Sequence, residues 1–498
     1  MGSVGSTNEA HTEPNRWAVL ALLGIAQLMV VLDATIVNIA LPSAQRSLHF
    51  STESRQWVVT AYALAFGSLL LLGGKLGDLF GRKWTFIAGL TGFSLASALG
   101  GLAQSFGTLV AARALQGAFG ALLAPSALSL LTVTFAGSPD RPKAFGIFGA
   151  IAGGGASLGL LLGGALTQAL SWRWCLYVNL VIAVPTALMS LRILVNYSDP
   201  NRPQIDVPGV LAGSGGLFAL VYGFSNAETH SWGAPVTVIA LAVSVILLVA
   251  FAFIERRASH PLLPLHIVWN RARGGAYASI VLTGSGIFAV FLFLTYFMQD
   301  NLGLSPLTTG VAFLPLTALI VVSSTTAQTR VVPRTGPKWL IVIGMALGLV
   351  AMLLLTRLSP TSTYVGAILP SLLILGVGMG LIFAPSFGTA TLGVASNEAG
   401  VASAMVNTSQ QVGGSVGTSL LSTLFASSAA AFARSHAGTK GVQTAALVHG
   451  YTTAFWWAAG IFAVGLIVAL VVLPGRVKGE IAGDETEPAG GEVSLATD

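Results

Sequence analysis

Fourteen apolar stretches of membrane-spanning length constrain the fold of this sequence more than any other feature. A transmembrane helix needs about 20 consecutive, mostly apolar residues. Stretches of that kind are bounded here by charged residues, by prolines or by Asn and Asp, and they lie at 17–38, 57–76, 84–103, 108–132, 144–168, 175–195, 209–226, 235–254, 275–298, 307–328, 338–356, 364–387, 400–426 and 452–473. Only 8% of the residues are charged, whereas a soluble domain carries roughly a quarter. We therefore predict an all-α polytopic membrane protein with fourteen transmembrane helices.

The distribution of lysine and arginine predicts the orientation of these helices. When the N-terminus is placed inside, the inner loops and tails hold far more basic residues than the outer loops do, as the positive-inside rule requires. An even number of spans then puts both termini in the cytoplasm.

Two linkers divide the predicted helices into sets. A segment rich in Pro and Asp lies at 196–208, and a basic segment lies at 255–274. The predicted organisation is a cytoplasmic tail, a six-helix bundle, a linker carrying helices seven and eight, a second six-helix bundle and an acidic cytoplasmic tail, at 1–15, 16–196, 197–256, 257–473 and 474–498. Residues 78–84 and 333–339 share a glycine at the same distance from a Lys-Trp pair, a weak internal repeat of the kind found in secondary transporters.

Two charged residues lie deep within the apolar stretches: Asp33 in the first and Arg113 in the fourth. A charge at the bilayer centre costs at least ~2.5–3.5 kcal/mol, so such residues are usually functional. At 1.5 Å per residue, Asp33 lies about 24 Å from the inner surface and Arg113 about 9 Å from the outer surface. Both depths fall in the outer half of a hydrocarbon core of about 30 Å, so the two side chains could pair.

Such a pair would suit proton coupling, since a buried carboxylate binds a proton more readily when a nearby cation moves away. The alternative is a static ion pair that fixes helix packing. Asp33 lies roughly 120° around its helix from Gln27 and Asn38, so we expect it to face a neighbouring helix rather than the main cavity.

Polar and aromatic residues within the stretches are candidates for a substrate cavity. The stretch 400–426 carries one polar stripe at helical spacing, which fits either a wet cavity or hydrogen bonds between helices. For the aromatic residues, simple packing is the alternative. The predicted cavity residues are Gln27, Asn38, Tyr62, Gln116, Phe293, Tyr296, Phe383, Phe387, Asn407 and Gln411.

The fifth stretch is a ridge of glycines, a pattern that lets helix backbones approach closely. We expect two halves of the protein to pack and rock along this ridge. Its glycines include Gly146, Gly155, Gly159, Gly163 and Gly164.

Several classes of chemistry find no support in the sequence. Cys175 is the single cysteine, and all seven histidines fall in loops, tails or span ends, which argues against a metal or haem site. No GxxxxGK[ST] phosphate-binding loop is present. The GxSxG matches at 155–159 and 413–417 lie in apolar helices rather than at a strand–turn–helix junction. We expect no catalytic residues, no metal and no cofactor, and the protein is not expected to be an enzyme.

Four segments resemble motifs of a known family. Residues 74–83 (GKLGDLFGRK) are similar to motif A of the major facilitator superfamily, and 109–117 (LVAARALQG) to its motif B. Residues 32–42 (LDATIVNIALP) resemble the first-span signature of fourteen-span drug:proton antiporters of the QacA/EmrB type, and 171–179 (SWRWCLYVN) fits the same group.

This resemblance implies the major facilitator fold, with two six-helix bundles and two extra central helices. It also implies that Asp33 and Arg113 serve proton coupling, with protons as the coupling ion. The motif A residues Gly74, Asp78, Gly81 and Arg82 would form the inner gate.

The chain departs from the family pattern at two positions. Leu79 replaces the basic residue that usually follows the motif A aspartate, and Leu160 replaces the proline of the glycine-rich antiporter motif C. Because proline bends a helix, we expect the fifth helix to be straighter here.

The function predicted from these observations is proton-coupled export of amphipathic organic compounds, antibiotics among them, across a bacterial cytoplasmic membrane by alternating access. The expected partners are small amphipathic substrates and membrane lipids. No nucleic acid is expected, and the protein should be a monomer. The alternatives are export of a lipid or a self-made metabolite, a membrane-embedded enzyme, and a structural or receptor protein that transports nothing.

Overall fold

The computed structural model describes residues 15–50, 54, 56–196, 206–438 and 441–475, and helix is the only regular secondary structure within these ranges. Six long helices come first: α1 (Arg16–Leu48), α2 (Gln56–Phe80), α3 (Arg82–Gly101), α4 (Phe106–Thr134), α5 (Arg141–Ala169) and α6 (Trp174–Ile193). Two further helices follow, α7 (Val207–Thr229) and α8 (Pro235–Glu255).

The rest of the chain contributes long helices interrupted by short π or 3₁₀ turns. They are α9 (Leu265–Trp269), α10 (Arg271–Tyr296), η1 (Phe297–Asn301), α11 (Pro306–Ala312), α12 (Leu314–Thr326), η2 (Ala327–Val331), α13 (Val332–Thr335), α14 (Pro337–Leu355), η3 (Tyr364–Ile368), α15 (Leu369–Ala390), η4 (Ser396–Glu398), α16 (Ala399–Ser435) and α17 (Val442–Val472).

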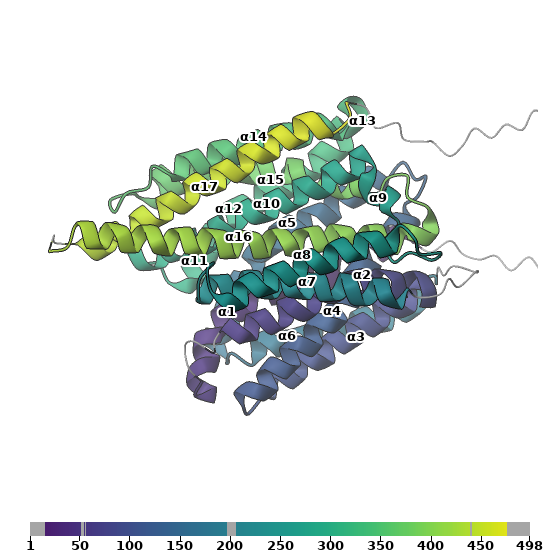
Figure 1. The fold of residues 1–498 in the computed structure, drawn as a ribbon, viewed down its shortest axis with the longest axis horizontal. Helices are drawn as coiled ribbons and strands as arrows, with labels where there is room; N and C mark the ends of the chain where they lie inside the picture. The colour runs from purple at the N-terminus through teal and green to yellow at the C-terminus, as the bar shows by residue number, and fades with distance from the viewer. Residues whose placement is uncertain (1–14, 51–53, 55, 197–205, 439–440, 476–498) are drawn as a thin grey trace, which may run out of the picture.

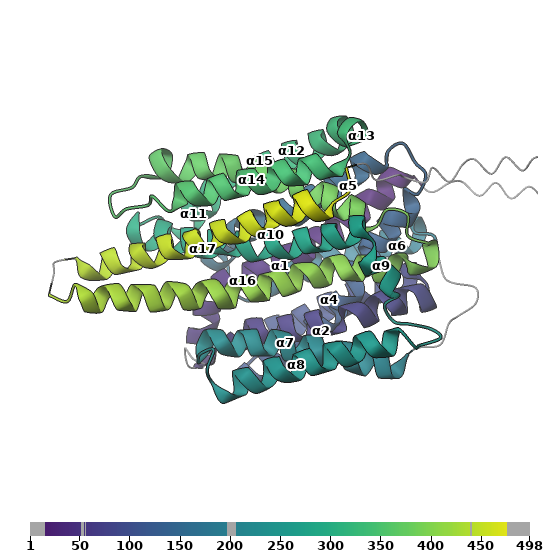
Figure 2. The ribbon, with the colours of Figure 1, turned by 45° about the horizontal axis from the view of Figure 1, so that its top comes forward.

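The long helices form two packed groups, α1–α6 and α10–α17, which we call the first and second halves (Figure 1). Helices α2, α4 and α5 of the first half contact α11, α12, α15 and α16 of the second. Helices α7 and α8 pack against each other, and α7 also contacts both α2 and α16, so the extra pair lies along the junction of the halves (Figure 2). The start of α1 and the end of α17 lie at the same end of the molecule, which we call the predicted cytoplasmic end.

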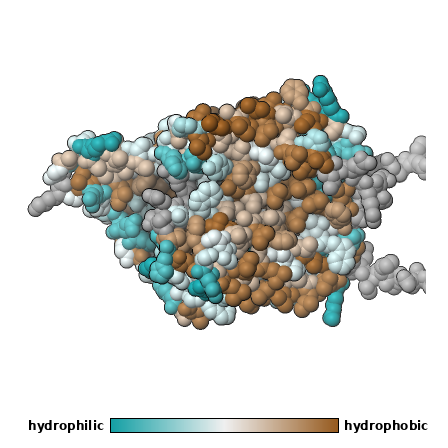
Figure 3. All heavy atoms as spheres, turned by 60° about the horizontal axis from the view of Figure 1, so that its bottom comes forward, coloured by the Kyte–Doolittle hydropathy of each residue, from teal (hydrophilic) through white to brown (hydrophobic). Residues whose placement is uncertain are grey.

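The face of the molecule drawn in Figure 3 carries a broad apolar region between more polar ends. Within the described residues, thirteen helices are long and apolar enough to cross a membrane. Helix α3 occupies the place of the predicted third span but is not among the thirteen, since it is the most polar of the long helices in the first half, with several Ser, Thr and Gly residues. The prediction of fourteen spans is therefore not confirmed by these helices.

Two helices extend well beyond their predicted spans. Helix α16 is 37 residues long, about 55 Å at 1.5 Å per residue, and α17 is 31 residues long. Together they form a hairpin that projects from the end opposite the termini (Figure 1). Hydropathy locates only the apolar part of a helix, so it does not reveal that 427–435 and 442–451 stay helical by packing against each other.

The predicted repeat between the halves falls on two similar turns. Gly81 precedes α3 with φ +94°, and Gly336 precedes α14 with φ +76°. Positive φ strongly favours glycine, so the same backbone geometry explains the shared glycine before Lys-Trp in both halves.

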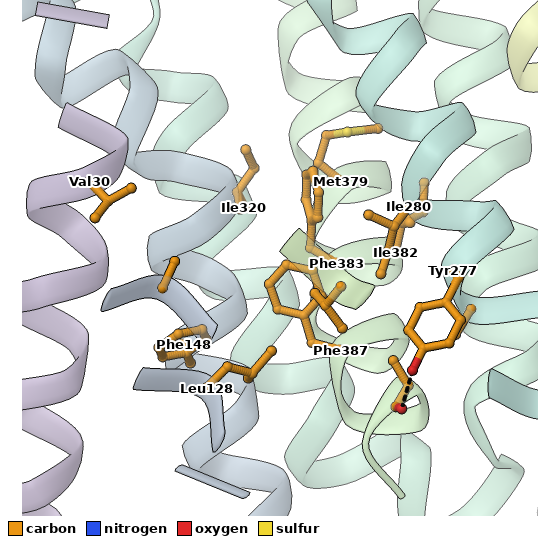
Figure 4. Packing of buried hydrophobic residues seen from close by; sticks show 14 of the residues in the cluster. Val30, Leu128, Phe148, Tyr277, Ile280, Ile320, Met379, Ile382, Phe383 and Phe387 are labelled. Atoms are coloured by element: carbon orange, nitrogen blue, oxygen red, sulfur yellow. Dashed lines mark hydrogen bonds between the residues drawn. The ribbon is translucent and has the colours of Figure 1, made fainter. Parts of the chain in front are cut away.

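Close apolar packing joins the two halves near the middle of the molecule. Phe383 and Phe387 of α15 lie between Phe148 and Leu128 of the first half and Tyr277 of α10 (Figure 4). The two phenyl rings contact each other edge to face, with centroids 5.9 Å apart. Because the Tyr277 hydroxyl donates to the backbone oxygens of residues 390 and 402, it ties α10 to the neighbouring helices.

Candidate functional site

The structure brings Asp33 and Arg113 together in the interior of the first half. Arg113 Nη1 donates to Asp33 Oδ2 at 2.6 Å, and the two side chains are 0% and 2% exposed. Asp33 comes from α1 and Arg113 from α4, so the contact crosses between helices. We call this ion pair the first-half pair.

Two amide side chains complete the environment of Asp33. Gln116 Nε2 donates to Asp33 Oδ1 at 2.7 Å, and Asn179 Nδ2 donates to the same oxygen at 2.8 Å. Gln116 Oε1 in turn accepts from Arg113 Nη1 at 2.6 Å. Buried polar groups need hydrogen-bond partners, and in this network both carboxylate oxygens of Asp33 have them.

The network continues to α3 through a serine. Asn179 Nδ2 also donates to Ser97 Oγ at 2.9 Å, and Ser97 Oγ donates to the backbone oxygen of Leu176 at 2.9 Å. Asn179 belongs to the segment that resembles the drug:proton antiporters, but its side chain was not predicted as a site residue. Nothing in the sequence marks Ser97, since serine is common in these helices.

Tyr62 supports Arg113 from α2. The guanidinium carbon lies 4.4 Å from the centre of the Tyr62 ring, a cation–π distance, and Arg113 Nε donates to the backbone oxygen of Val58 at 3.3 Å. Helices α2 and α4 come this close because position 117 is glycine. A Cβ at Gly117 would lie 2.4 Å from the backbone oxygen of Tyr62.

A second buried ion pair lies at the predicted cytoplasmic end. Arg82 Nη2 lies 2.8 Å from Asp78 Oδ1, and the two side chains are 3% and 4% exposed. The pair reaches across to the second half, because Arg82 Nη2 also donates to the backbone oxygen of Ser396, and the backbone N–H of Gly400 donates to Asp78 Oδ1 at 3.2 Å. We call this ion pair the bridging pair.

Glycine makes the bridging contact possible. A Cβ at Gly74 would lie 2.6 Å from the backbone oxygen of Gly400 and 2.8 Å from the Cβ of Ala404. Next to it, Lys75 Nζ donates to the backbone oxygen of Pro261 at 3.1 Å. Gly81 adopts a positive φ in the turn that connects α2 to α3.

The glycines of α5 serve two different faces of that helix. A Cβ at Gly155, Gly159 or Gly163 would press on residues of α1, at distances down to 1.9 Å. A Cβ at Gly146 or Gly149 would instead meet η2, α12 or α15 of the second half. The ridge therefore joins α5 to the second half through one set of glycines and to α1 through another. Gly164 is buried on the same helix.

Helix α5 has no proline in its interior; Leu160 stands at the motif C position and is 8% exposed. The straighter course expected for this helix stays a prediction.

The remaining predicted cavity residues lie in several places. Phe293 is buried in an aromatic group of the second half, beside Phe425, with ring centroids 5.1 Å apart, and beside Tyr451. Tyr296 is 44% exposed. Gln27 is buried in α1; Asn38 also lies in α1, but its side chain is outside the part of the chain that the structure describes.

The polar stripe of α16 satisfies part of its hydrogen bonding within the helix. Asn407 Nδ2 donates to the backbone oxygen of Ser403 at 2.9 Å, and Thr418 Oγ1 donates to that of Gly414 at 2.7 Å. Gln411 is partly buried against Gly67 of α2. Since α16 contacts α2, α4 and α7, the stripe runs along the junction of the halves.

A small cavity adjoins Arg113 on the side away from the predicted cytoplasmic end. Its other lining residues are apolar or aromatic and come from α1, α2, α4, α6 and the turn before α6: Val37, Ala40, Leu41, Ala44, Val58, Leu109, Trp172 and Leu176. Among the described residues, no group of three His, Cys, Asp or Glu side chains is placed to hold a metal ion.

Comparison with known proteins places this architecture in a family. The model of the Major Facilitator Superfamily matches residues 23–418. The chain belongs to the major facilitator superfamily. It is thus an integral membrane protein of a family of transporters, not of enzymes.

Relatives of this superfamily member include bacterial antibiotic resistance and export proteins. The chain is 48% identical to the puromycin resistance protein pur8 of Streptomyces alboniger over 96% of its own length and 94% of that protein. It is 36% identical to the cephamycin export protein CmcT of Amycolatopsis lactamdurans, over 95% of this chain and 96% of the relative.

A solved structure shares the fold. The human organic anion transporter MFSD10 superposes with a TM-score of 0.63 at 15% identity, covering 92% of this chain and 100% of that one. At this level of identity the likeness concerns the fold alone.

Proposed function

We propose that this member of the superfamily exports amphipathic organic antibiotics by alternating access, driven by protons that move inward. The observation that carries the proposal is the fully buried carboxylate of Asp33, held by Arg113 within the membrane-spanning part of a superfamily transporter. The names of the relatives, a puromycin resistance protein and a cephamycin export protein, support the substrate class.

In this proposal the bridging pair is the inner gate. With Asp78 and Arg82 bonded to backbone groups at the start of α16 and in the turn before it, the halves are joined at the predicted cytoplasmic end. Breaking these bonds would let the halves separate there and admit substrate from the cytoplasm.

Proton exchange in this proposal takes place at the first-half pair. When Arg113 withdraws, Asp33 takes up a proton that enters from the outer side, past the small cavity beside Arg113. When Arg113 returns, the carboxyl releases that proton to the inner side and the ion pair re-forms. Transport of substrate outward in one half-cycle is thereby tied to one proton moving inward in the other.

Rocking of the two halves as rigid bodies does not suffice for this exchange. Asp33 and Arg113 both belong to the first half, so their separation requires a shift of α1 relative to α4. Helix α1 packs closely on the glycines Gly155, Gly159 and Gly163. This smooth face of α5 is a surface along which α1 can slide.

A test uses inverted membrane vesicles with an imposed pH gradient and puromycin as the probe. We expect puromycin to release protons and to accumulate in wild-type vesicles, and Asp33→Asn to abolish accumulation while puromycin binding persists. The matched control is Asp300→Asn, which neutralises an exposed carboxylate and should transport normally. Unchanged accumulation in Asp33→Asn would remove Asp33 from the mechanism.

The cephamycin relative is named for export of one antibiotic, and a second candidate function is therefore export of a single compound, such as a self-made metabolite. Efflux assays with a panel of antibiotics, dyes and lipids, in a host without its own pumps, separate the two. A narrow response to one antibiotic class supports self-made product export, whereas a broad response supports multidrug efflux.

A further inference from the structure

Asp33 Oδ1 accepts from two amides that are anchored in different ways. Gln116 is oriented by Arg113, which donates to its amide oxygen. Asn179 is oriented by Ser97, and its side chain donates to Ser97 and Asp33 rather than bonding to Arg113. Of the two amides, only that of Gln116 therefore loses its anchor when Arg113 moves.

The Ser97 hydroxyl decides which end of the Asn179 amide faces Asp33. Its single hydrogen is directed to the backbone oxygen of Leu176, so its oxygen is left as an acceptor toward Asn179. The NH₂ group of Asn179 therefore spans Ser97 and Asp33, with one hydrogen for each. All four groups are buried, at 3% exposure or less, so no solvent competes for these bonds.

An amide N–H that points at a carboxylate favours the ionised form, whereas an amide oxygen would favour the protonated form. We infer that Asn179, locked by Ser97, is a positioning residue that sets the pH at which Asp33 gives up its proton. The inference rests on the proposed function. Asn179 would keep one donor on Asp33 after Arg113 has withdrawn, so that the carboxyl does not retain its proton through the whole cycle.

The groups around Asp33 allow this effect to be isolated. The titratable or charged side chains that face it are Arg113 from α4, Tyr62 from α2 and Cys175 from α6. Helix α5 presents glycines to α1, and α3 presents the neutral Ser97. Replacement of Asn179 or Ser97 changes none of the charges.

The experiment is an infrared titration of the purified full-length chain in lipid vesicles, without substrate. The band of the protonated Asp33 carboxyl is identified by its loss in Asp33→Asn, and its pH midpoint is measured. Because Asn179→Ala removes one N–H donor from the carboxylate, it should raise the midpoint by about one pH unit.

A second variant and a matched control accompany Asn179→Ala. Ser97→Ala should also raise the midpoint, but by a smaller amount, because Asn179 keeps its amide and loses only the hydrogen bond that orients it. Ser94→Ala removes a buried serine one turn away, bonded to the backbone oxygen of Thr91, and should leave the midpoint unchanged. A purely structural role would lower the amount of folded protein without moving the midpoint.

An unchanged midpoint in both Asn179→Ala and Ser97→Ala would overturn the inference and leave the role of Asp33 intact. If the wild-type protein shows no titrating band that Asp33→Asn removes, proton coupling through Asp33 fails, and the inference fails with it.

Discussion

The described part of the chain contains two buried Asp–Arg pairs that differ in what they connect. In the first-half pair, Asp33 and Arg113 are far apart in sequence, and all of their hydrogen-bond partners come from α1–α6. In the bridging pair, Asp78 and Arg82 are four residues apart and bond to the backbone around the start of α16. One pair is internal to a half, and the other joins two halves.

The pairs also differ in whether both carboxylate oxygens of the aspartate have hydrogen-bond partners. Both oxygens of Asp33 accept hydrogen bonds from side chains, whereas Asp78 Oδ2 is buried without a partner. A buried polar atom without a partner costs free energy, so the bridging pair is the one built to come apart. In the proposed mechanism, motion between the halves and proton exchange within the first half therefore use separate ion pairs.

The strongest test of this contrast is Arg113→Ala. Removing one partner of a buried ion pair leaves an uncompensated charge and costs ~3–5 kcal/mol, so we expect a large loss of thermal stability in detergent and no gradient-driven efflux. The double variant Asp33→Asn/Arg113→Ala should regain much of the stability but none of the transport. If the double variant is no more stable than the single one, the two side chains do not act as a pair.

Gly74→Ala should have the next largest effect, because the new methyl group would clash with the backbone of Gly400. Overpacking of this kind costs ~1–3 kcal/mol, and we expect efflux to fall at least about tenfold because the halves cannot close at this end. Gly77→Ala is the matched control, since its Cβ would make only ordinary contact, 3.4 Å from Ser126 Oγ. Equal activity of the two variants would contradict the close contact between α2 and α16.

A smaller effect is expected from Asp78→Asn, which loses the charge of the bridging pair but keeps one acceptor oxygen. The loss of a charged hydrogen bond, worth ~1.5–3 kcal/mol, should loosen the start of α16. The measurement is maleimide labelling of Ser403→Cys, a buried position on α16, in a Cys175→Ser background. Labelling should accelerate severalfold with Asp78→Asn and stay slow with Asp33→Asn; acceleration by both would mean that the two pairs are not independent.

Lys75→Ala should have the smallest effect. Its side chain is partly exposed and donates to the backbone oxygen of Pro261. Because water competes for this bond, we expect it to contribute only about 1 kcal/mol. Efflux of puromycin should stay within about threefold of wild type, as with Lys83→Ala, whose bond to Leu191 lies within the first half. A tenfold loss of efflux in Lys75→Ala but not in Lys83→Ala would mean that Lys75 helps the bridging pair to hold the halves together.

Much of this site could be predicted because the free-energy cost of burying a charge depends on where the residue lies in its own helix. The depths of Asp33 and Arg113 follow from counting residues along a helix of fixed rise, and the expectation that the two side chains meet follows from their similar depths. The need for glycine at Gly74 and Gly159 is also local, since a side chain there would block close packing.

The membrane location of this chain, the identity of its buried charges and the presence of superfamily motifs all follow from its residues read in order. The contacts of Ser97 and Asn179 with the site around Asp33, the confinement of the first-half pair to one half and the projecting hairpin of α16 and α17 became known from the folded structure. These features depend on which faces of helices distant in the sequence meet. That choice is made by the packing of many helices at once, and no single segment encodes it.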